Sequence, residues 1–542
     1  MNARFFMVRG GVLLAFSFLG MRLMYVQGVL RSGLIEKADR QCPIKTDIQN
    51  ARHRINDRNG APLAESVQVE SCFVDPSLVR NKRQVAGQLA AVFGFNEASF
   101  LARLRKANGS FLWVKRDVAS PAAEKIRILK IPGVGFKSET RRHYPMGVMA
   151  SHLLGFVGRD GAGLSGIEGG FDKTLNKTSG QSGDIQLTID AGIQQIVERE
   201  LEWGTKKTGA KKGMALVQDP WSGEILAMAN WPPVSLDADN PPAPADLRVP
   251  GLVDVFEPGS TFKIVTAAAA IEERLVSDKE MFDGENGAWK VADITIHDHE
   301  PVKRMSFEDV IVRSSNIGTA KIAERIGATR LYQYARLFGF GVQPGSGLTG
   351  EAKGVLRPVS KWSGVSKYVV SFGQEIGVTM VQLAGAYSAV ANGGVLMEPR
   401  LLKRITDDNG KSIWESTPSE VRRVIKPETS AKLTQILTHV VERGTGVNAQ
   451  IQWDPATKVA GKTGTAQKWD SAHHRYHDLL SLVSFCGFFP ADNPKLTMVV
   501  ILDEPEGRSW GGLDAAPIFR RIAEQLSSKL VAMHDKNNPK NL

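Results

Sequence analysis

The alternation of apolar and polar positions changes character near Gly213. Residues 40–200 hold short alternating runs separated by turn residues, among them the tight turn Asp57–Gly60. From Gly213 onward the apolar runs are longer and better separated. They predict two strands, 214–218 and 224–229, that form a hairpin. A loop rich in proline, 231–250, follows this hairpin.

The rest of the chain predicts helices enclosed by strands. The predicted helices cover residues 260–274, 306–340, 375–392 and 518–530. The predicted later strands cover residues 458–466, 482–489 and 496–502. Since strands occur at both ends of this segment and helices between them, we expect one α+β unit whose sheet is completed by both ends of the segment.

The longest apolar stretch lies at the amino terminus. Twenty-one residues separate Arg9 from Arg31, and Arg22 is the only charged residue among them. A helix of that length is about 31 Å long, enough to cross a bilayer core. The stretch Phe18–Gly20 is a poor site for signal cleavage. We therefore expect a tail at residues 1–9 and an uncleaved transmembrane anchor at 10–30.

Composition and charge narrow the class of protein. The 542 residues are 42% hydrophobic and 23% charged, which excludes a collagen-like, disordered or polytopic membrane protein. The net charge is +11, and residues 1–60, with ten Lys/Arg against four Asp/Glu, contribute +6 of it. No basic stripe interleaved with aromatic residues is present, so we expect no nucleic-acid partner. The clustered charge favours a segment beside a membrane.

The cysteines and histidines give no metal or disulfide framework. The three cysteines are Cys42, Cys72 and Cys486, and a bridge between the first two stays open in an oxidising compartment. Cys486 lies in an apolar run and is expected to be a buried thiol in a strand. Five of the ten histidines cluster in two stretches, which we interpret as solvated loops, and we expect no metal there; they are His297, His299, His473, His474 and His477.

Candidate chemistry begins at Glu257–Lys263. Proline and glycine form a turn just before the apolar run Ile264–Ile271, so Ser260 is expected to open a buried helix. Lys263 lies three residues later on the same helical face. Burial lowers the pKa of a lysine, and a neutral lysine can accept the proton of a serine. Ser-x-x-Lys alone is common, however, and does not establish a catalytic pair.

Two further short motifs follow. The first is Ser314-Ser315-Asn316, which could simply cap the next helix or could place a hydroxyl and an amide in a cleft. The second is Lys462-Thr463-Gly464-Thr465, predicted on a late strand, where lysine and threonine can bind a carboxylate. Gly464 would let an extended peptide approach and add to the sheet as a strand.

The three motifs together carry more weight than each alone. Ser-x-x-Lys, Ser-x-Asn and Lys-Thr-Gly, in this order, are the motif set of penicillin-binding proteins and active-site-serine β-lactamases. The chain resembles a class B penicillin-binding protein, a membrane-anchored peptidoglycan D,D-transpeptidase. Four stretches resemble the non-catalytic pedestal of that family: Arg54–Gly60, Tyr144–Gly147, Gly163–Glu168 and Leu187–Asp190. Ser371–Thr379, Gln382–Ala384 and Phe171–Lys173 resemble the division-specific, FtsI-type branch.

The resemblance implies a fold and a division of the chain. The fold is α+β: a β-lactamase-like transpeptidase domain with an antiparallel sheet flanked by helices, preceded by a pedestal domain and a single transmembrane helix. The pedestal, or dimerisation, domain is expected at 40–200 and the transpeptidase domain at 210–532. The catalytic part is expected outside the cytoplasmic membrane, with the amino terminus in the cytoplasm, because the substrate forms only outside.

The resemblance also implies roles for individual residues. Ser260 attacks the penultimate D-Ala of a stem peptide, and Lys263 accepts its proton. Backbone N–H groups of Ser260 and Thr465 form the oxyanion hole. Ser314 and Lys462 pass the proton to the departing D-Ala, while Asn316 holds a substrate carbonyl. Thr463, Gly464 and Thr465 bind the substrate.

No cofactor is implied. The implied partners are stem peptides ending in D-Ala-D-Ala, β-lactams, the membrane, an FtsW-type glycan polymerase and other division proteins. Four alternatives remain: an elongation-specific transpeptidase, a β-lactam sensor, a β-lactamase and a catalytically silent scaffold. The last three are disfavoured, each by a different feature. A single apolar span and the absence of a His-Glu-x-x-His motif argue against a sensor. The pedestal argues against a β-lactamase, and the intact motif residues argue against a silent scaffold.

Overall fold

The chain forms two compact units. One comprises residues 1–51 and 68–140, and the other residues 52–67 and 141–542. The computed structural model describes residues 2–28, 30, 51–107, 109–177, 182–236, 242–348, 350–470 and 475–536. Cys42, His473 and His474 lie outside the described residues, and so does the bridge from Cys42 to Cys72.

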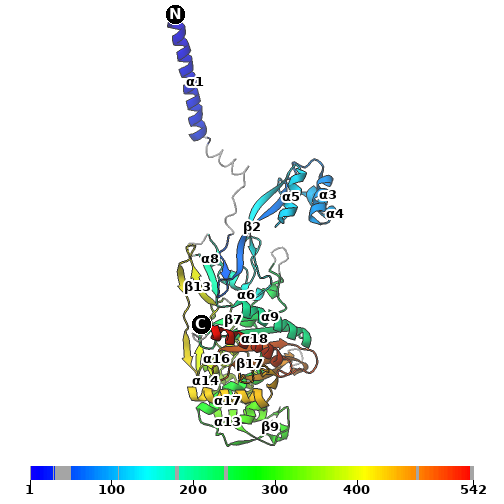
Figure 1. Ribbon diagram of the computed structural model, residues 1–542, viewed down its shortest axis with the longest axis vertical. Helices are drawn as coiled ribbons and strands as arrows, with labels where there is room; N and C mark the ends of the chain where they lie inside the picture. The colour runs from blue at the N-terminus through cyan, green and yellow to red at the C-terminus, as the bar shows by residue number, and fades with distance from the viewer. Residues whose placement is uncertain are drawn as a thin grey trace. The chain divides into compact units, whose positions relative to one another are not determined.

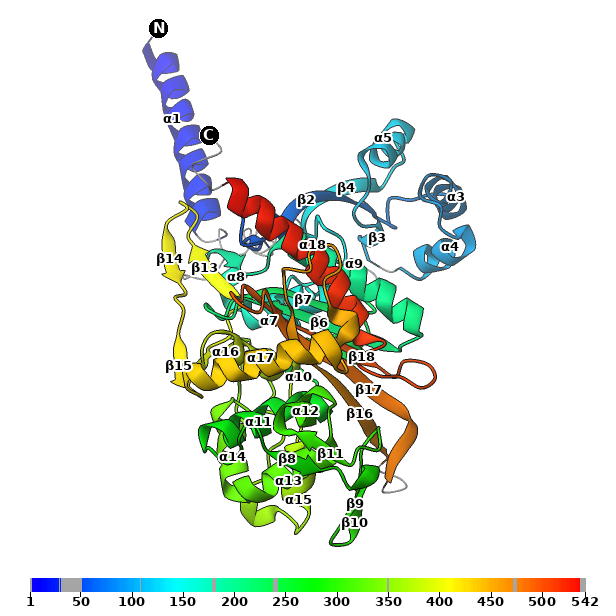
Figure 2. The ribbon, with the colours of Figure 1, turned by 60° about the horizontal axis from the view of Figure 1, so that its bottom comes forward.

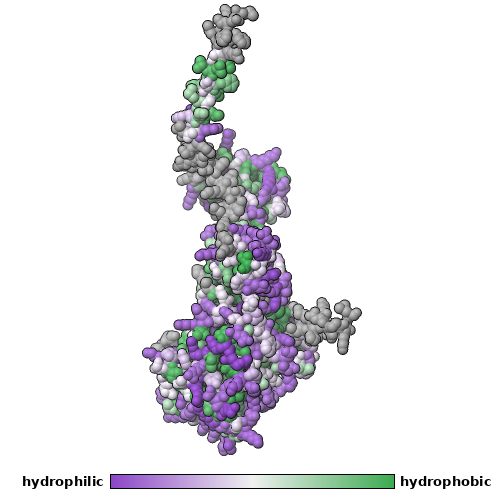
Figure 3. Space-filling model, turned by 90° about the vertical axis from the view of Figure 1, so that its left-hand side faces the viewer, coloured by the Kyte–Doolittle hydropathy of each residue, from purple (hydrophilic) through white to green (hydrophobic). Residues whose placement is uncertain are grey.

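The amino-terminal segment is a helix, as expected. Helix α1 covers Asn2–Gly28 and is drawn in blue in Figure 1. Its part Gly10–Gly28 is long and apolar enough to cross a membrane, and none of it is buried against the rest of the protein. In Figure 3 most residues of this part of the helix are coloured as hydrophobic. The predicted apolar helix is therefore confirmed, although it ends at Gly28.

The described residues of the stretch 68–140 form a small lobe of strands and helices in the first unit. Its elements are β2 (Pro62–Val74, which begins in the second unit), α3 (Lys82–Phe93), α4 (Glu97–Lys106), β3 (Leu112–Lys115), α5 (Ser120–Leu129) and β4 (Val134–His143). Strand β2 pairs with β3 and β4. Asn81 and Asn96 cap α3 and α4 with their side chains. Cys72 is buried in this core, and burial raises the pKa of its thiol to about 12.

The second unit begins with a mixed sheet in the order β14-β13-β5-β1-β2. Its new strands are β1 (Ile55–Asn56), β5 (Asp184–Leu187), β13 (Leu402–Thr406) and β14 (Ser412–Glu415). The expected turn at Asp57–Gly60 is present, with Gly60 N donating to Asp57 O. Nearby, the buried Glu168 accepts from Arg52 at 2.9 Å and from Arg142 at 2.6 Å. This buried network ties together stretches far apart in sequence.

A five-stranded antiparallel sheet forms the centre of the second unit. Its order is β16 (Ala460–Asp470), β17 (Arg475–Phe489), β18 (Leu496–Asp503), β6 (Lys212–Gln218) and β7 (Ile225–Trp231). The predicted hairpin and the three late strands are thus confirmed, and both ends of the segment complete one sheet. Strand β16 lies at the edge of this sheet. Cys486 is fully buried in β17, as expected.

Alternate residues of these strands face two separate cores. Helices α9 (Ala191–Thr208) and α18 (Ala515–Lys536) cover one face, and α16 (Met380–Ala391) packs on the other (Figure 2). Phe485 and Phe489 of β17 both contact Phe519 of α18 edge to face, with ring centroids 4.7 and 5.9 Å apart. The period-two pattern of each strand is what allows helices to cover both faces.

The helical lobe differs in detail from the sequence prediction. Its helices are α10 (Pro250–Val253), α11 (Lys263–Glu272), α12 (Phe307–Val312), α13 (Asn316–Ile326), α14 (Ala328–Leu337), α15 (Ser366–Ser371) and α17 (Pro427–Arg443). The helix predicted over 306–340 is three helices, because Ser314 and Gly327 have positive φ angles of 61° and 76°. The helix predicted over 375–392 begins at Met380, because Thr379 and Gln382 form a capping box.

The remaining elements are short. They are α6 (Ser151–Leu154), α7 (Gly166–Gly170), α8 (Asp172–Leu175), β8 (Met281–Asp283), β9 (Ala288–Val291), β10 (Ile294–His297), β11 (Arg304–Ser306), β12 (Val395–Met397) and β15 (Glu420–Arg423). Strand β15 pairs with β12, and β9 pairs with β10.

Candidate active site

The serine of the first motif lies in a tight turn ahead of a buried helix. Gly259–Phe262 is a single 3-10 turn, and α11 begins only at Lys263, so Ser260 precedes the α-helix that it was expected to open. Gly259 has φ 53°, and a Cβ there would lie 2.7 Å from the carbonyl oxygen of Thr465. Gly259 N also donates to Gly373 O at 3.1 Å. Glycine is therefore required, because the turn is held between β16 and the loop at Gly373.

Lys263 is completely buried at the start of α11. Its Nζ donates to the carbonyl oxygen of Ser314 at 2.6 Å, to Ser314 Oγ at 3.2 Å and to Asn316 Oδ1 at 2.8 Å. Burial lowers the pKa of Lys263 to about 7, although the charge of Asp298 acts in the opposite direction. At neutral pH a substantial fraction of this amine is uncharged and able to accept a proton.

The neighbouring residues of the second motif, Ser314-Ser315-Asn316, make different contacts. Ser315 caps α13, since its Oγ accepts from Gly318 N at 2.9 Å. Ser314 precedes it with a φ of 61° and directs both of its oxygens to Lys263. The capping interpretation is thus correct for Ser315, while Ser314 and Asn316 remain at the lysine. Both of these residues are partly accessible to solvent.

Asp298 is a site residue that the sequence did not reveal. Its carboxylate accepts from Asn316 N at 2.5 Å, from Ile317 N at 3.0 Å and from Ser315 Oγ at 2.5 Å. A carboxylate at a helix N-terminus is favourable, and here it also fixes the backbone that carries Asn316. No motif marks Asp298, because it lies in a loop 18 residues before Asn316. The only signal was its proximity to the two histidines.

Lys462 occupies the edge strand β16 and is also completely buried. Its Nζ donates to Thr463 O and to Thr463 Oγ1, both at 3.2 Å. Burial and the nearby charge of Lys263 lower its pKa well below the ordinary value. Thr463 Oγ1 in turn lies 2.8 Å from Thr445 Oγ1. The amines of Lys263 and Lys462 are both buried, so their protonated forms are poorly solvated. An anionic group of a substrate in this region would stabilise those charged forms.

The edge strand closely approaches the serine turn. A Cβ at Gly464 would lie 2.9 Å from Thr261 Cγ2 and 3.0 Å from Pro258 O. Thr465 is partly exposed, and its carbonyl faces Gly259. The structure therefore brings Ser260, Lys263, Ser314, Asn316 and the strand segment Lys462–Thr465 into one region. Such an arrangement supplies a hydroxyl nucleophile, a proton-accepting amine and an open sheet edge.

Two loops border this region. Gly511 N donates to Thr465 Oγ1 at 3.3 Å. The neighbouring Trp510 packs against His299 with ring centroids 4.2 Å apart and ring planes inclined by 44°. His297 and His299 are both exposed. Among the described residues, no group of three or more His, Cys, Asp or Glu side chains could hold a metal ion.

Glu257 is a further acidic neighbour of the serine turn. Its carboxyl group accepts from Glu375 N at 2.9 Å and from Tyr476 Oη at 3.2 Å. Burial raises the pKa of Glu257. It links the turn to β17 through Tyr476 and to the loop that precedes α16 through Glu375.

Comparisons with known proteins agree with this arrangement. Residues 213–524 match the penicillin binding protein transpeptidase domain, and residues 47–216 match the penicillin-binding protein dimerisation domain. The chain is 33% identical to "Probable peptidoglycan D,D-transpeptidase FtsI" of Caulobacter vibrioides, covering 99% of this chain and 91% of that protein. It is also 33% identical to "Stage V sporulation protein D" of Bacillus subtilis, covering 97% of this chain and 85% of that protein.

Solved structures give the same assignment. Penicillin binding protein 3 of Mycobacterium tuberculosis, in complex with aztreonam, superimposes with a TM-score of 0.71 at 29% identity, covering 89% of this chain and 97% of that one. The predicted family and fold class are confirmed by these matches, and so is the transpeptidase type of enzyme. This chain belongs to the class B penicillin-binding proteins, in which a transpeptidase domain follows a dimerisation domain and an apolar amino-terminal helix.

Proposed function

We propose that this protein is a septal peptidoglycan D,D-transpeptidase that cross-links stem peptides through an acyl-enzyme on Ser260. The observation that carries the proposal is the buried amine of Lys263, three residues after Ser260 and hydrogen-bonded to Ser314 and Asn316. A lysine whose pKa is about 7 can act as a base at neutral pH, whereas an ordinary lysine cannot.

Acylation follows from these positions. Ser260 Oγ attacks the carbonyl carbon of the penultimate D-Ala, and its proton passes to the neutral amine of Lys263. The oxyanion that forms is stabilised by the backbone N–H groups of Ser260 and Thr465. Ser314 Oγ, 3.2 Å from Lys263 Nζ, relays the proton onward to the departing D-Ala amine, with Lys462 assisting. The C–N bond breaks and an ester on Ser260 remains.

The second half-reaction reverses this proton path. An amine of a neighbouring stem peptide attacks the ester, and Lys263 and Ser314 accept its proton. The peptide cross-link forms, and the hydroxyl of Ser260 is restored. A β-lactam presents a strained amide in place of D-Ala-D-Ala and leaves Ser260 acylated. No step of this scheme requires a cofactor.

Substrate binding is assigned to the edge of the sheet. The stem peptide adds as a strand beside β16, which is the outermost strand in the sheet order. Its terminal carboxylate binds to Thr463 and Thr465 in the field of Lys462, and Asn316 donates to a peptide carbonyl. Gly464 lets the serine turn pack against this strand, since a Cβ there would lie 2.9 Å from Thr261 Cγ2.

The chain organisation in this proposal is that of a single-pass protein of the cytoplasmic membrane. Residues 1–9 lie in the cytoplasm, 10–30 span the membrane, 40–200 form the pedestal and 210–532 form the transpeptidase domain. The catalytic part lies outside the membrane because its substrate is formed there. The proposed protein partners are an FtsW-type glycan polymerase and other division proteins.

The division branch is supported by two observations. The relative in Caulobacter vibrioides carries the name FtsI and matches over 99% of the chain. In addition, the stretch Ser371–Thr379 resembles the division branch. It contacts the serine turn through Gly259 N, which donates to Gly373 O, and α11 through Thr266 Oγ1, which donates to Ser371 O. The elongation-specific enzyme is the alternative.

Labelling with a fluorescent penicillin tests the nucleophile. The wild-type protein is expected to form a long-lived covalent adduct, and Ser260→Ala is expected to form none, because the attacking hydroxyl is removed. Ser277→Ala, an exposed serine after α11, is the matched control and should label like the wild type. Stable labelling of Ser260→Ala, or rapid turnover of the drug by the wild type, would contradict the proposal.

Depletion of the protein in its own bacterium tests the division role separately. Cells are expected to grow into long filaments, since septal cross-linking stops while elongation continues. Wild-type protein supplied in trans should restore division, and Ser260→Ala should not. Rounded cells in place of filaments would assign the protein to elongation and leave the acyl-enzyme chemistry intact.

The pKa of Lys263 sets a pH dependence for acylation. Because burial lowers this pKa to about 7, the amine is mostly protonated below that pH and mostly neutral above it. The second-order rate constant for penicillin acylation should therefore rise about tenfold between pH 6 and pH 8, as the neutral fraction does. Stopped-flow or gel measurements over this range give the profile. A flat profile would show that Lys263 is not the base.

Asp298→Asn should displace that profile in a defined direction. The charge of Asp298 raises the pKa of Lys263, so its removal lowers that pKa and moves the midpoint of the profile to lower pH. The plateau rate should fall severalfold, since Asn316 loses a charged anchor. Glu300→Gln, two residues away and exposed, is the control and should leave the midpoint in place. An unchanged or higher midpoint in Asp298→Asn would refute the effect of this charge on Lys263, and an unchanged plateau rate would refute its positioning of Asn316.

A further inference from the structure

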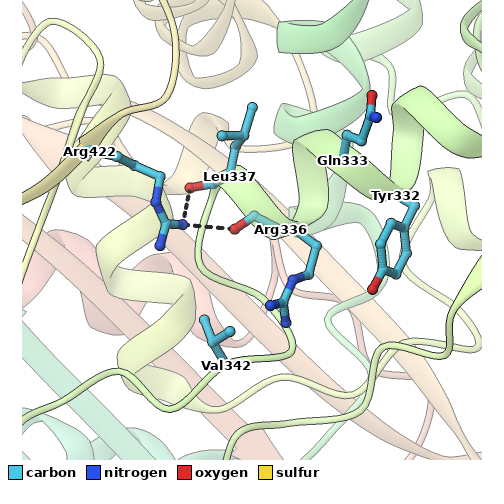
Figure 4. A pocket seen from close by; sticks show the side chains of 6 residues that line it. All are labelled: Tyr332, Gln333, Arg336, Leu337, Val342 and Arg422. Carbon is cyan, nitrogen blue, oxygen red and sulfur yellow. Dashed lines mark hydrogen bonds between the residues drawn. The ribbon is translucent and has the colours of Figure 1, made fainter.

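A second pocket lies in the helical lobe and shares no residue with the active site. It is lined by Tyr332, Gln333, Arg336 and Leu337 of α14, by Val342 of the loop that follows, and by Arg422 of β15 (Figure 4). Its space is about 860 Å³, including the part open to solvent. In Figure 4 the side chains of Arg336 and Tyr332 extend from α14 in the same direction, and Arg422 reaches the end of the helix from the opposite side.

In the described part of the chain, the two arginines of this pocket donate hydrogen bonds only to backbone carbonyl groups. Arg422 Nη1 donates to the carbonyl oxygens of Arg336 at 2.9 Å and Leu337 at 3.1 Å, which end α14. Arg336 Nη1 donates to Gly341 O at 2.8 Å. Within the part of the chain that the structure describes, neither guanidinium forms an ion pair with a carboxylate. Arg330 of the same helix, by contrast, pairs with Glu273 at 3.6 Å.

Arg336 and Arg422 are both partly exposed and line one pocket without a carboxylate partner, so their like charges repel each other and stay uncompensated. An anion between them would remove both penalties, and guanidinium groups bind carboxylate and phosphate with two parallel hydrogen bonds. The backbone contacts use one nitrogen of each arginine, Nη1, and hold the groups in place while the other nitrogens stay available. The pocket is therefore built to accept a negative charge.

The walls of the pocket add an apolar component. Tyr332, Leu337 and Val342 are among its lining residues and contribute apolar surface. A second hollow adjoins it and shares Val342 and Arg422; its other lining residues include Phe338, Pro344, Leu396, Met397 and Val421. An anionic ligand that carries a flat or aliphatic group could place its charge at the arginines and its apolar part along this surface.

We propose that the pocket between α14 and β15 is a binding site for a small organic anion, a carboxylate or phosphate attached to an apolar group, held by Arg336 and Arg422. This site is separate from the reaction cleft and does not depend on the function proposed above. Free carboxylates and phosphate esters share the chemistry that the two arginines recognise, so both are included as probes.

Calorimetric titration of the full-length protein tests the proposal. The probes are benzoate and phenyl phosphate, with benzyl alcohol as the neutral compound of similar shape. The wild type is expected to bind one equivalent of an anionic probe, and benzyl alcohol should bind at least tenfold more weakly. Arg336→Gln and Arg422→Gln should each weaken anion binding about tenfold or more, because each removes a charge-assisted contact. The ratio of the two anion affinities tells which group the site prefers.

Arg330→Gln is the matched control, since it removes one positive charge from the same helix outside the pocket. Its affinity should equal that of the wild type. Arg422 also caps α14, so the thermal midpoint of unfolding is measured for each variant. If Arg422→Gln is destabilised, the test of the proposal rests on Arg336→Gln. The proposal is overturned if no anionic probe binds, or if Arg330→Gln weakens binding as much as Arg336→Gln. It is also overturned if binding persists in Arg336→Gln. That result would place the anion elsewhere, for example near Lys263 and Lys462.

Discussion

The burial of the Lys263 amine without a carboxylate in contact is the constraint on which the active site depends. Three neutral oxygens of Ser314 and Asn316 satisfy its hydrogen bonds but do not neutralise its charge. Desolvation is therefore only partly offset, and the pKa falls to about 7. A salt bridge in the same position would stabilise the ammonium and remove the base. Asp298 lies one step away, where it orders the backbone at Asn316 without pairing with the lysine.

The fold explains how residues 200 positions apart come to surround this amine. Strand β18 pairs with β6, so the beginning and the end of the domain share one sheet, and β16 forms its edge beside the serine turn. Close backbone contacts then fix the turn, since neither Gly259 nor Gly464 leaves room for a Cβ. Ser260 and the edge strand β16 are thus positioned by rigid backbone rather than by flexible side chains.

The helices and strands that could be predicted from the sequence are those with long, well-separated runs of apolar residues. The strands of the five-stranded sheet and the buried Cys486 follow directly from their apolar runs. The Ser314-Ser315-Asn316 motif was harder to place, because Ser314 interrupts a helical pattern with a positive φ angle that no periodicity indicates. Asp298 and Glu257 escaped notice as site residues for another reason: their roles arise from tertiary contacts with segments distant in sequence. The same holds for residues 52–67, which fold with the second unit although they precede a separate lobe.

The unusual state of one lysine can be measured directly. In protein labelled with carbon-13 lysine, the side-chain signal that disappears in Lys263→Met identifies this residue, and its shift is followed with pH by nuclear magnetic resonance. The account predicts a midpoint close to 7, far below that of the exposed lysines. A midpoint above pH 10 would mean that the amine stays charged at neutral pH, and it would contradict Lys263 as the proton acceptor.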